Sequence, residues 1–300
     1  MTDIRRGGVI ARRSEPSSWL VVPALVFFAI FALAPLVIAL LLSFTSWDGL
    51  TPPVFDGLDG WVSKLTDPVT YNALWLSFQV IILSWLVQTP LSILVGVFIA
   101  GNQRYRAVLA ALYFLPLILS SAAIALAFKA LLDPNYGLGH ALGIPLLNQN
   151  WLGNPHIVLY VVIFVIAWQF VPFHSLLYQA GARQIPKSLY EAAAIDGAGR
   201  VKQFFHITLP QLRNTIIASS TLMTVGSLTY FDIVYIMTQG GPGYATRLLP
   251  LDMYLTGFQA SDLGGASVLA VLLIVIGLLI ALGLTRLSGF NRFTSEQEGA

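Results

Sequence analysis

The stretch Tyr190-Glu-Ala-Ala-Ala-Ile-Asp-Gly-Ala-Gly-Arg200 is a polar segment of small residues between two long hydrophobic segments. It is too polar for the core of a bilayer, so it must lie in water. The helix formers over 188–194 predict a short helix that Asp196-Gly197 ends, with Asp196 capping the next turn. Ala193 and Gly197 are four apart, and small residues at that spacing allow a partner backbone to approach closely. The stretch therefore predicts a helix that another protein can bind.

The composition is that of an integral membrane protein. Hydrophobic residues make up 56% of the 300-residue chain, charged residues 10%, and the mean hydropathy is +0.76, outside the range of soluble domains. The chain has no cysteine, which excludes disulfides and thiolate metal sites, and its four histidines show no ligand spacing, so we expect no metal site. The net charge is only +2 and the basic residues lie in loops, so we expect no nucleic-acid partner.

Six segments are long and apolar enough to cross a bilayer, which needs about 20 helical residues. The sequence therefore predicts an all-α, polytopic membrane protein with six transmembrane helices. The first segment is too long for a cleaved signal peptide and is expected to remain as an anchor. We expect a tail over 1–18, a transmembrane domain over 19–286 with a loop at 181–214, and a second tail over 287–300. The predicted spans are 19–44, 71–100, 107–132, 157–180, 215–238 and 266–284.

The basic residues predict the orientation in the membrane. Thirteen of the sixteen Lys and Arg residues lie before the first span or after the second, fourth and sixth spans. The opposite loops hold Lys64 and Arg247, and Lys129 lies near a helix end. Because basic residues favour the cytoplasmic side, both termini and the 181–214 loop are expected in the cytoplasm. An even number of spans agrees with this.

The cytoplasmic loop also resembles a known motif. Glu191-Ala192-Ala193, with Gly197 six positions after the Glu and then Ile207 and Leu209-Pro210, is similar to the EAA loop of ABC-importer permeases. We expect Leu209-Pro210 to end a second short helix before the fifth span. The resemblance implies a type I ABC-importer permease fold, in which the helix at about 189–198 sits in a cleft of a separate ATPase subunit. The ATPase-coupling residues that it implies are Glu191, Ala192, Ala193, Asp196, Gly197, Ala198, Leu209 and Pro210.

A second motif narrows the family. Phe231-Asp232-Ile-Val-Tyr-Ile-Met-Thr238-Gln-Gly-Gly-Pro242, followed by Thr246, resembles the end of the fifth span in carbohydrate importer permeases, most closely the maltose-type and glycerol-phosphate-type subunits. It departs from that pattern at Gln239, where many relatives have glycine.

This resemblance implies a set of partners and a location. It implies a carbohydrate substrate delivered by an extracytoplasmic solute-binding protein, and a second permease subunit that is expected to be a different chain. It also implies two ATP-binding cassette subunits, which hold ATP and Mg, so that no cofactor is expected on this chain. The expected location is the inner, or cytoplasmic, membrane as a multi-pass protein in contact with lipid.

The resemblance to the maltose-type subunit also implies which residues line the substrate path. Gapless alignment on Pro172 and the EAA motif, and on Gly240-Gly241-Pro242, places sugar-lining positions on the helices before and after the loop. Aromatic side chains suit the flat face of a sugar, and amides and hydroxyls suit its hydroxyl groups. The aligned positions are Ile166, Gln169, Phe170 and Phe173 in one helix and Met223, Gly226, Ser227 and Tyr230 in the other.

Asp232 is the one acidic residue that we place inside a span, where an ionisable group is expected to face the bundle or a cavity. It therefore joins the substrate-path candidates. The structural alternatives stay open: the aromatic residues can be packing residues, and Asp232 can bond neighbouring helices near the outer boundary. The candidates are Gln169, Phe170, Phe173, Gly226, Ser227, Tyr230 and Asp232.

Other functions are disfavoured. No Gly-x-x-x-x-Gly-Lys-Ser/Thr motif occurs, so the chain itself cannot hold ATP as a P-loop does. An intramembrane enzyme needs converging groups, and His174 has no evident acid or Ser partner in the sequence, so we expect no catalytic residues. A secondary transporter of a small polar solute, which would carry internal repeats and ion-binding acids, remains the alternative. The favoured interpretation is one half of an ATP-driven importer.

Overall fold

The computed structural model describes residues 18–101 and 104–287 and is almost entirely helical. The elements are η1 (Ser18–Val21), α1 (Val22–Phe28), η2 (Ala29–Leu33), α2 (Ala34–Leu42), β1 (Thr45–Ser46), β2 (Val54–Phe55), α3 (Asp59–Thr66), α4 (Pro68–Ile99), α5 (Arg104–Tyr113), α6 (Leu115–Ile118), α7 (Ser121–Leu131), α8 (Leu138–Leu142), η3 (Pro145–Leu147), α9 (Val158–Gln184), α10 (Lys187–Ile195), α11 (Arg200–Gln203), η4 (Phe204–Thr208), α12 (Leu209–Gln211), α13 (Arg213–Ser227), α14 (Asp232–Thr238), α15 (Leu249–Tyr254), η5 (Leu255–Gln259) and α16 (Leu263–Leu287).

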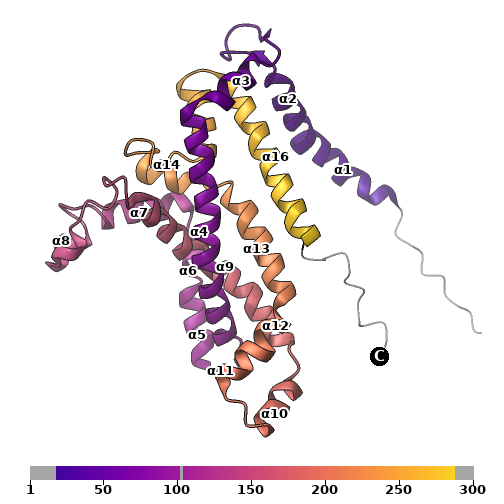
Figure 1. Cartoon of the computed structure of the whole chain (residues 1–300), viewed down its shortest axis with the longest axis vertical. Coiled ribbons are helices and arrows are strands. Elements are labelled where there is room, and N and C mark those ends of the chain that lie inside the picture. The colour runs from indigo at the N-terminus through magenta and orange to yellow at the C-terminus, as the bar shows by residue number, and fades with distance from the viewer. Residues whose placement is uncertain (1–17, 102–103, 288–300) are drawn as a thin grey trace, which may run out of the picture.

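The centre of the fold is the pair of long helices α4 and α9, with α13 and α16 beside them (Figure 1). The main buried cluster joins α4 and α9 to α7 and α14, and Val80, Val162 and Val234 are fully buried in it. The antiparallel pair β1–β2 and helix α3 lie at the upper end of the view, and α10 and α11 lie at the lower end. The segments that connect the long helices therefore lie at two opposite ends of the bundle.

Four apolar helices are long enough to cross a membrane, and they coincide with the first, second, fourth and sixth predicted spans. They cover Val22–Leu42, Pro68–Ile99, Val158–Gln184 and Leu263–Arg286. The fifth predicted span, 215–238, is two helices, α13 and α14, bent by 46° at a short break. The described part of the chain therefore contains four candidate spans, or five if the bent pair is one.

The third predicted span, 107–132, is not one helix. The structure divides it into α5, α6 and α7. Pro116 lies in the first turn of α6, and Leu119 adopts an extended conformation (φ −81°, ψ 143°) that ends α6. Ser120 then caps α7 by accepting a hydrogen bond from Ala123 N–H at 3.2 Å. The hydropathy of the segment hid these local stop and start signals.

Of the candidate spans, the first has the smallest share of buried residues. Its α1 half extends away from the bundle in Figure 1, whereas α2 contacts α16. None of its 18-residue apolar window is buried within the chain. The tails expected over 1–18 and 287–300 lie almost wholly outside the described residues.

Candidate substrate cavity and coupling loop

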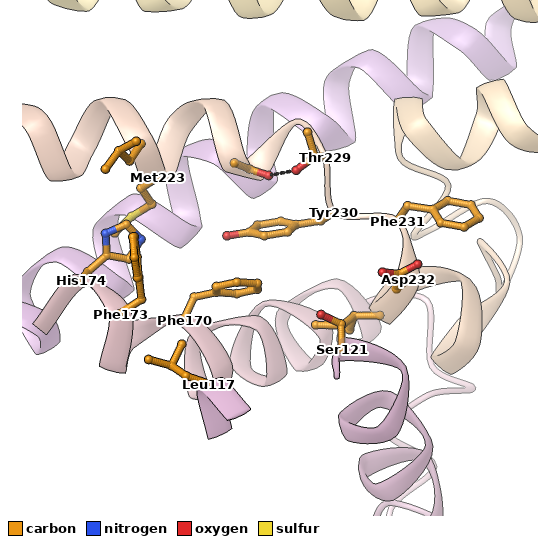
Figure 2. A pocket seen from close by; sticks show the side chains of 13 residues that line it. Leu117, Ser121, Phe170, Phe173, His174, Met223, Thr229, Tyr230, Phe231 and Asp232 are labelled. Atoms are coloured by element: carbon orange, nitrogen blue, oxygen red, sulfur yellow. Dashed lines mark hydrogen bonds between the residues drawn. The ribbon is translucent and has the colours of Figure 1, made fainter. Parts of the chain in front are cut away.

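A cavity of about 440 Å³ lies between α6, α9, α13 and α14. We call it the central cavity. Of the seven substrate-path candidates, the five that line it are Phe170, Phe173, Gly226, Tyr230 and Asp232. Figure 2 shows Phe173 near one end and Asp232 near the other, with Phe170 and Tyr230 between them. Residues from two distant parts of the sequence thus meet around one space.

The break between α13 and α14 shapes this cavity. The α13 helix ends at Ser227, and Thr229 Oγ1 donates to Gly226 O at 2.8 Å just beyond it. The chain then turns so that the Tyr230 ring faces the Phe170 ring, with 5.5 Å between centroids (Figure 2). Asp232 begins α14, where the helix dipole favours a negative charge. The bend therefore presents an aromatic ring and a carboxylate to the same cavity.

The remaining lining residues were not among our candidates, although the alignment had pointed to Met223. They are Leu117, Ser121, His174, Leu222, Met223, Thr229, Phe231 and Ile233. Among the described lining residues, Asp232 is the only acid, and Lys and Arg are absent. Aromatic faces with a few hydroxyl groups and one carboxylate suit an uncharged, polyhydroxylated solute. Ser121 begins α7 and Thr229 lies in the turn after α13, and neither position has a signal in the sequence.

Gln169 and Ser227 do not line the cavity. The Gln169 amide donates from Nε2 to Ser121 Oγ at 3.1 Å, so it joins α9 to the start of α7. The buried Ser227 donates from Oγ to Met223 O at 2.8 Å, along its own helix. Ile166, the other aligned position of α9, is fully buried in the main cluster. Both aligned helices thus contribute to the cavity lining, but not every aligned position faces it.

His174 has a serine partner that no motif in the sequence indicated. Its Nδ1 lies 2.9 Å from Ser219 Oγ, which belongs to α13. Ser219 is fully buried and is absent from the cavity lining. Among the described residues, no acidic side chain joins the pair as a third member. A buried serine out of reach of the cavity is not positioned as a nucleophile, so the contact joins α9 to α13.

The predicted helix of the 181–214 loop is α10, which ends close to where Asp196-Gly197 was expected to end it. Gly197 has φ +74°, the left-handed conformation that favours glycine at the end of a helix. The backbone N–H of Ala198 donates to Ala193 O at 2.8 Å, and that of Gly197 donates to Ala194 O at 3.0 Å. These bonds pair carbonyls that the helix end would otherwise leave free.

Two local expectations for this loop were wrong. The N-cap of α11 is Gly199 rather than Asp196, and it makes no side-chain capping bond. Leu209-Pro210 does not end the second helix, because α11 continues through the π-helical turn η4 into α12. Pro210 stands in the first turn of α12, where a missing N–H is tolerated.

The loop is anchored to the ends of the long helices. Tyr190 Oη lies 2.9 Å from Thr208 Oγ1, which joins α10 to η4. Tyr190 also packs on a second buried cluster, which includes Tyr178 of α9 and Leu212 before α13. These contacts of Tyr190 therefore link α10 to η4, to α9 and to the start of α13. Neither contact was among our predictions from the sequence.

The outward surface of the loop carries the motif residues. Glu191, Ala192, Asp196, Gly197 and Pro210 are exposed, while Ala193, Ala198 and Leu209 are half-buried. Three large apolar side chains that we had not singled out are exposed beside them, namely Ile195 (87%), Val201 (72%) and Phe205 (56%). The sequence signal for these three side chains is that they are apolar residues in an otherwise polar loop. A water-facing surface of this kind is typical of an interaction site.

Comparisons with known proteins agree with this architecture. The family described as "Binding-protein-dependent transport system inner membrane component" matches residues 88–289. The probable ABC transporter permease protein YurN of Bacillus subtilis is 34% identical over 268 residues, covering 87% of this chain and 91% of the relative. The multiple sugar-binding transport system permease protein MsmF of Streptococcus mutans is 31% identical and covers 86% of this chain and 90% of its own length.

Solved structures show the same fold. One is a chain of a bacterial ABC transporter involved in the import of the acidic polysaccharide alginate, with a TM-score of 0.80, 24% identity and coverage of 92% of this chain and 95% of that one. The alginate transporter is also solved in complex with a periplasmic protein bound to an alginate pentasaccharide. The family match covers most of the chain, and the relatives are named as permease subunits. The chain therefore belongs to the family of binding-protein-dependent transport system inner membrane components.

Proposed function

We propose that this chain is a permease subunit of an ATP-driven importer and forms half of the path of a sugar or oligosaccharide. The observation that carries the proposal is the central cavity, which joins the Phe170 and Tyr230 rings to Asp232 and to hydroxyl groups. Relatives named for sugar transport and the alginate transporter support a carbohydrate substrate. The complex of that transporter with its periplasmic protein supports delivery by a solute-binding protein.

The direction of the helices supports the membrane topology that we propose. Gly96 of α4 lies against Ser175 and Tyr178 of α9 near the ends of both helices, and Ser92 donates to Val171 O one turn earlier. Since α4 and α9 thus run parallel, the chain must return across the membrane between them. We therefore assign the third crossing to α5, α6 and α7 together. With the bent fifth span, the proposed topology has six crossings of the inner membrane. The distribution of Lys and Arg supports placing both termini in the cytoplasm.

The energy source is proposed to be a separate pair of ATP-binding cassette subunits, which carry ATP and Mg. The exposed face of α10, with Glu191 and Gly197, is the proposed docking surface, and Ile195 supplies apolar area beside it. A second permease subunit, expected to be a different chain, would close the other side of the central cavity. Its helices would also cover the apolar α1 segment that this chain leaves unpacked.

The coupling role is tested by Glu191→Lys. We expect it to lower ATP-dependent uptake at least tenfold and to weaken co-purification of the ATPase, because it reverses an exposed charge on the docking face. Gln211→Lys adds a positive charge to an exposed position of the same loop outside α10 and serves as the control. Uptake and the amount of protein in the membrane are measured together. Normal uptake by Glu191→Lys at normal expression would refute the docking assignment.

A further inference from the structure

A second hollow lies on the side of the bundle and shares no residue with the central cavity. It has a volume of about 840 Å³ and runs between α4, α13 and α16. We call it the lateral groove. Its walls are apolar and include Ile82, Trp85, Ile216, Ile217, Ile280 and Leu284. No substrate-path candidate lies in it, so the proposed transport route does not account for it.

The lateral groove contains one cation. The polar atoms of its wall are paired within the protein, since Trp85 Nε1–H donates to Ser220 Oγ at 2.8 Å and Thr224 Oγ1 donates to Ser220 O at 2.7 Å. Arg213, at the first position of α13, lines the end next to the coupling loop and is exposed. Among the described residues, the Arg213 guanidinium has no hydrogen-bond or ion-pair partner. The groove is therefore an apolar trough that ends at a positive charge.

The length of the groove matches one leaflet of a bilayer. From Arg213 to Thr224 the α13 helix rises about 17 Å, roughly half of the ~30 Å hydrocarbon core. A transmembrane helix of a partner would need a groove that runs across both leaflets. The acyl chain of a lipid in one leaflet fits this length better.

We infer that the lateral groove binds an anionic phospholipid, with its acyl chain along the apolar wall and its phosphate on Arg213. An arginine at the membrane boundary attracts an anionic headgroup and can donate two parallel hydrogen bonds to phosphate oxygens. Leu209 and Pro210 of the coupling loop line the same end of the groove. The bound headgroup therefore contacts the base of the loop. The inference rests on the proposed membrane placement but not on transport.

The test measures lipid binding to the purified full-length chain by native mass spectrometry. Phosphatidylglycerol and phosphatidylcholine with the same acyl chains are compared. We expect about a fivefold preference for phosphatidylglycerol, the ratio that corresponds to about 1 kcal/mol per basic residue near a membrane surface. Arg213→Gln is expected to abolish the preference. Arg286→Gln is the matched control, since Arg286 lies about 200° around α16 from the groove residue Leu284.

A second variant distinguishes binding of the acyl chain from binding of the headgroup. Ile280→Trp fills the groove and should weaken binding of both lipids while Arg213 remains in place. Equal binding of the two lipids, or a preference that survives Arg213→Gln, would overturn the inference.

A cross-linking experiment identifies the occupant of the groove. Because the chain has no cysteine, Ile217→Cys introduces a single thiol that can be cross-linked in the assembled importer. Cross-linking to another subunit, rather than to a photoactivatable phosphatidylglycerol, would show a protein occupant and would equally overturn it. Failure of the transport assays would leave these results unchanged.

Discussion

Gly197 fixes where α10 ends, and with it the shape of the proposed docking surface. A Cβ at this position would meet nothing within 4 Å, so the constraint is conformational rather than steric. We predict that Gly197→Ala destabilises the end of α10 by about 1–2 kcal/mol, the cost of a left-handed conformation for an L-residue. Faster amide hydrogen exchange over 187–198 and reduced uptake are the measured outcomes.

Gly199→Ala is the matched control for this prediction. Gly199 also has open space around its Cβ position, but its φ of −67° is ordinary for any residue. The control should therefore exchange and transport as the unmodified chain does. If both variants behave alike, the left-handed conformation at 197 is not what shapes the loop.

The motif alignment predicted which helices face the central cavity better than which side chains do. Phe170 and Tyr230 line it, whereas Gln169 and Ser227, placed by the same alignment, do not. The reason is that the direction of a side chain depends on how helices rotate against one another. The partners that decide their directions are Ser121 on another helix and a carbonyl of the same helix. The spacing of residues in the sequence predicts neither of these hydrogen-bond partners.

At the scale of elements, the close approach of α4 to α9 depends on Gly96. A Cβ there would lie 2.6 Å from Ser175 O and 2.7 Å from Tyr178 Cβ, so the two helices would have to separate. We predict that Gly96→Ala destabilises the protein by about 1–3 kcal/mol, as overpacking of a filled core does. The midpoint of thermal unfolding of the purified protein measures this. Gly283→Ala on α16, where a Cβ would meet nothing within 4 Å, should leave the midpoint unchanged.

The corner before α15 is stabilised by a buried ion pair. Arg247 Nη2 lies 2.7 Å from Asp252 Oδ1, and Thr70 Oγ1 of α4 donates to Asp252 Oδ2 at 3.2 Å. Asp252→Asn leaves the arginine unpaired, and we predict a loss of about 3 kcal/mol, the lower end of the range for a broken buried pair, because Arg247 retains 20% exposure. Thermal or denaturant unfolding measures the loss.

Two further variants identify burial as the cause of that loss. The Lys64–Asp262 pair is more exposed (16% and 43%), so Lys64→Gln should cost less than about 1 kcal/mol. Replacing both partners of the buried pair, with Arg247→Met and Asp252→Leu together, should recover most of the stability. Equal losses from Asp252→Asn and Lys64→Gln would mean that burial of the pair contributes nothing.

Elements were predictable where hydropathy alone defines them. The long helices α4, α9 and α16 follow from their apolar length. The division of 107–132 and the bend before Asp232 were missed, because an apolar window averages over Pro116, Ser120 and Thr229. Those same breaks bring Ser121, Tyr230 and Asp232 to the central cavity. The least predictable parts of the fold are thus the parts that build the site.

At the scale of the whole molecule, the chain has the features of one subunit of a larger assembly. None of the apolar window of the first span is buried within the chain, and the motif face of α10 is exposed to water. The proposed second permease would complete the wall of the central cavity. The sequence predicted the partners only through its resemblance to importer permeases, because composition and periodicity describe a single chain.

Uptake into proteoliposomes tests the central claim most directly. The chain is reconstituted with the second permease, the ATPase subunits and the solute-binding protein encoded with it, and the sugar bound by that protein is supplied outside. We predict uptake that requires internal ATP, stops with a hydrolysis-defective ATPase and persists when proton and sodium gradients are dissipated. Uptake that continues without the ATPase and follows an ion gradient would contradict the account and favour a secondary transporter.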